Sequence, residues 1–237
     1  ETTFKKLKGD ERVKVQMCFD GPHSNSSVIV ESLSYLSYDK SLIDLVFYNN
    51  FKENEWAIKN YMKQYGNGYN SISNTYVEGL GTYELRSLIF SDSVRYGGDY
   101  SLHIDTHFYL KNKDTIQLLM VENKDIISPM INTEQTLNSN FWGAVDDNGY
   151  FMESYDYHDI RTYDKKGTFV VPFIGGVIMY SNDILKNGVF DGILSDVSDE
   201  TISDYGSDHM VVLMNIIREK NLFMYTTNKR YYGKFFN

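Results

Sequence analysis

The sequence predicts a single α/β domain with a mostly parallel sheet flanked by helices. Short apolar runs alternate with segments of helical periodicity along the first half of the chain, in repeats of about thirty residues. Such repeats are typical of strand–helix–strand units, whose right-handed crossovers produce parallel sheets. The 237 residues also contain no internal repeat, no low-complexity segment and no linker rich in Pro, Gly and Ser. We therefore expect one domain.

The first half predicts four strands that alternate with three helices. Residues 13–19 carry Val13, Val15 and Met17 at period two, which indicates a strand. Residues 42–48 form the continuous apolar run of a strand buried on both faces. The other expected strands are 71–77 and 100–105. The first expected helix has Ile29, Leu33 and Leu36 on its apolar face and Ser26 or Ser27 as its N-cap. The two further expected helices are 53–64 and 83–94.

The second half of the chain is less regular. Its polar, Tyr-rich part, residues 132–166, has few periodic signals. The remaining segments predict a helix over 115–123, a strand over 126–131, one or two buried strands within 167–180, a helix over 208–219 and a closing strand over 222–226.

Composition excludes several classes of protein. The chain has 23 Lys and Arg against 32 Asp and Glu, a formal net charge of −9, which argues against nucleic-acid binding. A phosphate-bearing ligand would therefore need a local cation or a metal. The longest apolar run, residues 169–180, has twelve residues interrupted by Pro172 and is too short to span a membrane. The one cysteine, Cys18, lies in an apolar run and is expected to be a buried, inert thiol.

Candidate ligands follow the fourth expected strand, because open α/β sheets bind ligands at the carboxyl ends of their strands. Asp105 and His107 lie two residues apart and share one side of the strand if it extends that far. A carboxylate and an imidazole in this arrangement suit one divalent ion, or form an ordinary hydrogen-bonded pair. Asp208 and His209, at the start of the late helix, offer a further metal ligand or general base. Asp208 is equally suited to cap that helix.

An ordered series of residue blocks lies in the second half of the chain: Asn123-Lys124-Asp125-Ile126-Ile127-Ser128-Pro129-Met130, Ser139-Asn140-Phe141-Trp142-Gly143, Gly149-Tyr150, Val171-Pro172 and Thr227-Asn228-Lys229-x-x-Tyr232-Gly233. This series resembles the collagen-modifying glycosyltransferases, the family of procollagen galactosyltransferases and of the glycosyltransferase-like domains of procollagen lysyl hydroxylases. The similarity extends from the first strand to the C-terminus.

The resemblance implies a GT-A fold, with a nucleotide-sugar half at about residues 11–131 and an acceptor half at about 132–237. In this family an Asp-x-Asp motif holds manganese against the diphosphate of a UDP-sugar. Here the motif falls on Asp105 and His107, so an imidazole replaces the second carboxylate. Asp208 matches an acidic position of the galactosyltransferases, where it implies a metal-bridging or catalytic base role. His209 departs from a second acidic position.

The resemblance and the fold also indicate residues that bind substrates. Asn140 and Trp142 are candidates for binding an acceptor or donor sugar, because indole faces stack on sugar rings; Trp142 is equally suited to fix its loop to the sheet. Asp20, Tyr48 and Asn49, at the ends of the first two strands, are expected to contact uridine.

Two functions follow from the resemblance. In the first, the domain transfers galactose or glucose from a UDP-sugar, with manganese, to hydroxylysine or galactosyl-hydroxylysine in collagen-like polypeptides. In the second, it is a non-catalytic accessory domain of a multidomain lysyl hydroxylase. Either implies the endoplasmic reticulum lumen, and a neighbouring hydroxylase or second glycosyltransferase domain as a partner. The charged opening segment has no initiator Met, so we expect a fragment of a longer protein.

Overall fold

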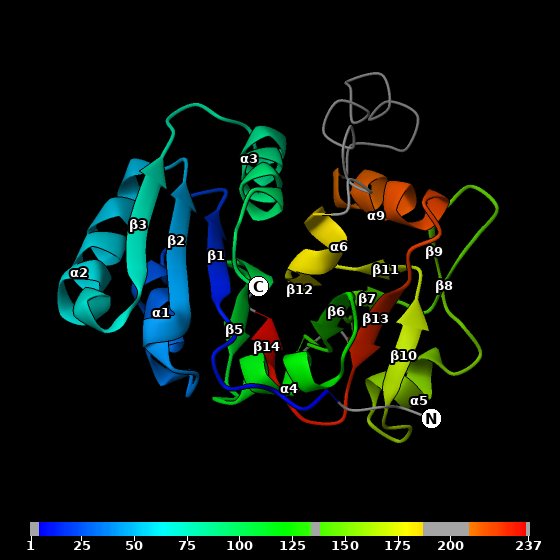
Figure 1. The fold of residues 1–237 in the computed structure, drawn as a ribbon. Coiled ribbons are helices and arrows are strands. Elements are labelled where there is room, and N and C mark those ends of the chain that lie inside the picture. The colour runs from blue at the N-terminus through cyan, green and yellow to red at the C-terminus, as the bar shows by residue number, and fades with distance from the viewer. Residues whose placement is uncertain (1–4, 134–137, 187–208, 236–237) are drawn as a thin grey trace.

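Figure 1 shows a computed structural model of the chain, which describes residues 5–133, 138–186 and 209–235. A central sheet contains β1 (Val13–Phe19), β2 (Ile43–Asn49), β3 (Ser71–Tyr76), β4 (Tyr100–Asp105), β6 (Ile126–Pro129), β10 (Thr168–Val171), β12 (Val177–Ser181) and β13 (Met224–Thr227). Its eight strands have the order β10-β13-β6-β12-β4-β1-β2-β3. Only β12 and β10 run against the others within this sheet. The predicted mostly parallel sheet is confirmed.

Helices cover both faces of the sheet. α1 (Ser26–Ser32), α2 (Glu55–Tyr65) and α4 (Thr115–Val121) pack on one face, where Val13, Val15 and Met17 point. α3 (Thr82–Val94) covers Cys18 and Tyr48 on the opposite face, and α6 (Asn182–Lys186) and α9 (His209–Glu219) continue that layer over the second half. No helix among the described residues combines the length and apolar character needed to cross a membrane.

Several short elements lie outside the predicted pattern. β5 (Phe108–Leu110) pairs with β14 (Gly233–Phe235), β7 (Phe141–Trp142) with β11 (Phe173–Ile174), and β8 (Ala144–Val145) with β9 (Phe151–Met152). α5 (Tyr157–Arg161) and four 3-10 turns, η1 (Leu33–Tyr35), η2 (Lys40–Leu42), η3 (Lys52–Asn54) and η4 (Gly66–Gly68), complete the described elements. Strands of two or three residues show no periodicity, so the sequence could not predict them.

Two predictions about local structure are wrong. The N-cap of α1 is Asn25, which makes no side-chain cap hydrogen bond, and Ser26 is already helical. The segment 167–180 forms three strands and not one or two, because Pro172 separates β10 from β11 and a glycine turn separates β11 from β12. In that turn Gly176 has φ of 73°, and a Cβ there would lie 1.8 Å from Cε2 of Phe108. Only glycine fits this position.

Asp44 connects several segments near the amino ends of the strands. Its Oδ2 accepts hydrogen bonds from Arg12 Nη2 at 2.7 Å and the Tyr96 hydroxyl at 2.7 Å. Its Oδ1 accepts from Asn70 Nδ2 at 2.6 Å and Ser71 Oγ at 2.6 Å. Burial opposes ionisation, but these donors outweigh it and hold the pKa of the Asp44 carboxyl below its usual range.

We predict that Asp44→Asn lowers the free energy of unfolding by about 1–3 kcal/mol at pH 7, because the buried Tyr96 hydroxyl and three donors on exposed residues lose a charged acceptor. The folded pKa lies below the unfolded value, so the stabilisation is complete above the unfolded pKa of about 3.9 and is lost as pH falls through the folded pKa. Urea unfolding at pH 7 and pH 3 should therefore show a smaller difference from wild type at pH 3. The exposed Asp147→Asn is the control. A difference that does not vary with pH would contradict the assignment.

Candidate functional site

Two aspartates lie at the edge of the sheet where β1 and β4 end, called the carboxyl edge below. β1 and β4 are parallel neighbours with Cys18 opposite Asp105, and Asp20 follows β1 directly. The Asp105 amide donates to the carbonyl of Gly176 at 2.7 Å, which fixes the end of β4 against the turn before β12. The sheet topology therefore brings the two carboxyl groups to one edge.

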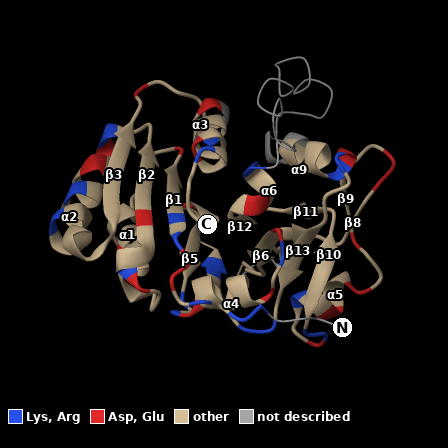
Figure 2. Ribbon diagram, in the orientation of Figure 1, with Lys and Arg blue, Asp and Glu red and all other residues tan. Residues whose placement is uncertain are grey.

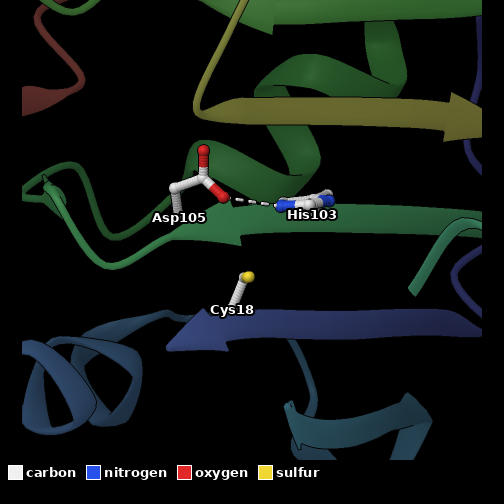
Figure 3. A group of neighbouring side chains, drawn as sticks. All are labelled: Cys18, His103 and Asp105. Atoms are coloured by element: carbon white, nitrogen blue, oxygen red, sulfur yellow. Dashed lines mark hydrogen bonds and ion pairs between the residues drawn. The ribbon is translucent and has the colours of Figure 1, made fainter. Parts of the chain in front are cut away.

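The Asp105 carboxylate is buried and fully engaged. Its Oδ1 lies 2.9 Å from His103 Nε2, as Figure 3 shows, and its Oδ2 accepts a hydrogen bond from Arg86 Nη2 at 3.2 Å. The residue is only 5% exposed. Burial opposes its charge, but Arg86 and then His103 outweigh burial and lower the pKa of the carboxyl below its usual value. Asp105 is therefore ionised at neutral pH.

Arg86 reaches this edge from α3. The same Nη2 that contacts Asp105 lies 3.5 Å from Asp20 Oδ2, so one guanidinium bridges the two aspartates. We call Asp20, Arg86 and Asp105 the aspartate–arginine cluster. Arg86 was not among the residues predicted from the sequence. The sequence does indicate where Arg86 lies on its helix. The apolar residues Ile89 and Phe90, which are buried, follow it by three and four residues, and this spacing places Arg86 beside the inward face of α3.

Histidines surround the cluster. His23 Nε2 lies 2.7 Å from Thr106 Oγ1 and 3.9 Å from Asp20 Oδ1. The expectation that Asp105 and His107 share one side of a strand is wrong, since β4 ends at Asp105 and His107 lies in the following turn. His107 is exposed, and its ring stacks on Phe235 with centroids 5.8 Å apart. The imidazole in contact with Asp105 belongs to His103.

The described residues do not fit a manganese ion. They contain one group of three possible ligands with donor atoms within 4.8 Å of one another: Cys18, His103 and Asp105 (Figure 3). Manganese prefers carboxylate, carbonyl and water oxygens, whereas this group includes a thiol and an imidazole. Burial raises the pKa of the Cys18 thiol well above its usual value, so it stays protonated and inert, as expected.

Two of the predicted ligands cannot be placed. Asp208 lies outside the described residues. His209 begins α9, but its side chain is not among those described.

Tyr48 and Asn49 have structural contacts. Tyr48 is buried under α3, where its hydroxyl donates to Asp92. Asn49 is fully buried; its Oδ1 accepts from the amide of Phe51 at 3.1 Å and its Nδ2 donates to Glu55 Oε1 at 3.2 Å. Tyr48 therefore ties β2 to α3, whereas Asn49 holds the loop after β2 in place. Of the three residues expected at uridine, only Asp20 has its side chain in the aspartate–arginine cluster.

Asn140 joins three segments of backbone. Its Nδ2 donates to the carbonyls of Pro129 at 3.0 Å and Gly175 at 3.1 Å, and its Oδ1 accepts from the amide of Ile131 at 2.8 Å. Trp142 is half-buried and stacks on Phe173 with centroids 4.3 Å apart and planes at 20°. The Asn140 side chain therefore fixes the backbone beside β6 and β11, while Trp142 keeps part of its surface in solvent.

We predict that Asn140→Ala lowers the free energy of unfolding by about 1–3 kcal/mol or more, because buried carbonyls and an amide lose their partner. Chemical denaturation checks this, with the exposed Asn148→Ala as a matched control expected within about 0.5 kcal/mol of wild type. A stable Asn140→Ala protein would argue that Asn140 serves ligand binding instead of the fold.

Sequence relatives of the chain include two procollagen-lysine,2-oxoglutarate 5-dioxygenases. The chain is 28% identical over 212 residues to procollagen-lysine,2-oxoglutarate 5-dioxygenase 1 of Gallus gallus, covering 85% of this chain and 27% of the relative. The Homo sapiens protein of the same name is 26% identical over 237 residues, covering 95% of this chain and 31% of the relative. The chain thus spans less than a third of the length of these relatives.

Solved glycosyltransferases share the fold. Staphylococcus aureus TarS, residues 1–349, superimposes with a TM-score of 0.60 at 10% identity, covering 95% of this chain and 60% of TarS. GalNAc-T7 with UDP, GalNAc and Mn2+ gives 0.60 at 13% identity, covering 94% of this chain and 42% of GalNAc-T7. These similarities show a GT-A fold. The family model described as "Glycosyltransferase family 25, N-terminal domain" matches residues 8–237, and the chain belongs to that family.

Proposed function

We propose that the domain binds a UDP-sugar at the carboxyl edge and transfers galactose or glucose to hydroxylysine, or to galactosyl-hydroxylysine, in collagen-like polypeptides. The observation that carries this proposal is the meeting of Asp20, Arg86 and Asp105 where α/β sheets bind their ligands. Relatives named for procollagen lysine support the acceptor. TarS in complex with UDP-GlcNAc supports the donor.

The two halves of the chain are proposed to bind different substrates. Residues 11–131 contribute the aspartate–arginine cluster and bind the nucleotide sugar, while residues 132–237 bind the acceptor. Trp142 offers a half-exposed indole next to Phe173 as a stacking surface for a sugar. Asn140 contributes by holding the segment before Trp142.

An acidic surface in the second half supports a cationic acceptor. Figure 2 marks acidic residues on the loop that joins β8 to β9. Asp146 and Asp147 of this loop line a hollow of about 400 Å³ together with Glu219 and Arg218. Collagen-like polypeptides carry lysines, which such a hollow attracts electrostatically.

The proposal assigns no step of the transfer to manganese. Manganese held by Asp105, His107 and His209 is supported by the Mn2+ complexes of GalNAc-T7 and of a Pyrobaculum calidifontis mannosyltransferase that also binds GDP-Man. The described residues around Asp105 do not fit that ion, because the Arg86 guanidinium already places a positive charge on Oδ2 and the neighbouring ligands are a thiol and an imidazole. Negative charge that develops on the departing diphosphate must still meet a cation at this edge.

A second candidate function is a non-catalytic accessory domain of a multidomain lysyl hydroxylase in the endoplasmic reticulum lumen. It is favoured by exposed apolar side chains beside the edge strand β10. Val170 and Phe223 are 58% and 65% exposed and line a hollow of about 410 Å³. A neighbouring domain of a longer protein would cover such a surface.

We predict that the protein transfers hexose from UDP-galactose or UDP-glucose to a peptide that contains hydroxylysine, detected as a mass increase of the peptide. Asp105→Ala should reduce the rate by about 100-fold or more, because the cluster that meets the diphosphate loses its anchor. Asp183→Ala, an exposed aspartate at the start of α6, is the control. Thermal melting must show that each variant is folded. Failure of the wild type with both donors would contradict transfer and favour the accessory function.

A further inference from the structure

We propose that Arg86 is the cation that receives the diphosphate of the nucleotide sugar, so that the domain binds its donor without a divalent metal. This inference rests on the proposed function, since it concerns the same UDP-sugar. It assigns to a residue of the chain the positive charge that the family resemblance assigns to manganese.

The guanidinium is held in place before any ligand arrives. Carboxylates from two neighbouring strand ends fix Arg86, one at 3.2 Å on Asp105 and one at 3.5 Å on Asp20. The Arg86 side chain is 19% exposed, so it reaches solvent at the carboxyl edge although most of it is buried. A cation fixed in this way loses little conformational freedom when it binds phosphate.

The two contacts of Arg86 are unequal. Asp105 is the closer partner and its side chain is only 7% exposed, while Asp20 is farther away, 12% exposed and lies in the loop after β1. Asp20 also has His23 within 3.9 Å. A diphosphate therefore competes with Asp20 for the guanidinium and leaves the contact with Asp105 intact. The planar fork of arginine suits this geometry, because it can contact a carboxylate and a phosphate along different edges.

A metal at Asp105 would face an established positive charge. The Asp105 oxygen that a metal would take is in contact with the Arg86 guanidinium, and the other oxygen contacts His103. Two cations on one carboxylate repel each other strongly in a site this buried. Mn2+ would have to displace Arg86 from Asp105, the more buried of the two aspartates, whereas a phosphate would compete with the less buried Asp20.

The charge of the cluster sets the kind of anion that it binds. One guanidinium against two carboxylates gives a formal charge of 1 − 2 = −1 when His23 and His103 are neutral. A free phosphate ion therefore gains little, and the ligand must add contacts of its own. A diphosphate joined to uridine fulfils that condition, because the nucleoside supplies the additional binding.

Isothermal titration with UDP, first in EDTA and then with MnCl2, tests the inference on the wild-type protein. We expect binding in EDTA and the same dissociation constant with manganese. Arg86→Met should weaken UDP binding by about 10- to 100-fold, the loss expected for a charge-assisted hydrogen bond, and leave uridine binding unchanged. Arg95→Met, an exposed arginine at the other end of the same helix, is the matched control and should bind UDP like wild type.

Arg86→Met leaves Asp105 without its cation and can destabilise the fold, so Arg86→Lys is the second variant. It keeps the charge but lacks the planar fork, and we expect UDP affinity between those of wild type and Arg86→Met. As a measurement independent of any variant's folding, the guanidinium NMR signal of Arg86 in wild type should shift with UDP and not with uridine.

Each outcome decides the inference. Metal-free UDP binding that depends on Arg86, together with the NMR shift, supports it. Binding only with manganese, binding that persists in both folded Arg86 variants, or an Arg86 signal unmoved by UDP overturns it and leaves the proposed function standing. No UDP binding under either condition overturns both.

Discussion

Two buried or nearly buried aspartates at one edge of the sheet are the constraint on which the surrounding structure depends. Parallel pairing of β1 with β4 brings Asp20 and Asp105 together, and their low exposure means that water alone cannot balance their charge. Arg86 balances it from α3, which ties that helix to both strand ends. Beneath this contact Gln16 donates to the carbonyl of Ile89 at 2.9 Å, so the same helix is also fixed along β1. The contacts that pack α3 against the strand ends therefore also balance the charge of the two aspartates.

The sequence predicted the elements whose signals are local. β1 and β4 have the predicted bounds, because apolar residues alternate in one and polar groups end the other. The segment between residues 132 and 166 and the run 167–180 could not be resolved in this way. Their strands exist through long-range contacts, such as the pairing of Phe173 with Trp142 and the hydrogen bonds of Asn140 to Pro129 and Gly175. No periodic pattern encodes such contacts.

The residues of the candidate site were likewise predictable from the sequence only in part. Asp105 could be located from the sequence, because it ends a buried strand of a parallel sheet. Its contact with Arg86 could not be located, because the spacing of Ile89 and Phe90 places Arg86 beside the inward face of α3 but does not show which strand end its side chain reaches. A polar residue at a strand end also does not reveal which way it points. Tyr48 and Asn49 occupy the expected positions, yet Tyr48 donates to Asp92 under α3 and Asn49 braces its own loop. The sheet topology determines at which strand end Tyr48 and Asn49 lie. The packing of α3 and α2 determines which way their side chains point.

An acidic chain needs a local cation to bind a diphosphate. A fixed guanidinium and a metal ion would supply that cation in different ways. A net charge of −9 favours the approach of cations and disfavours that of nucleotides. A metal adds positive charge only when the ion is present, so donor binding follows metal supply. Arg86 is always charged, but the chain's own carboxylates hold it, so in the proposed metal-free binding the displacement of Asp20 would limit donor affinity. The strength of donor binding would then depend on the residue at position 20, which competes with the ligand for a single cation.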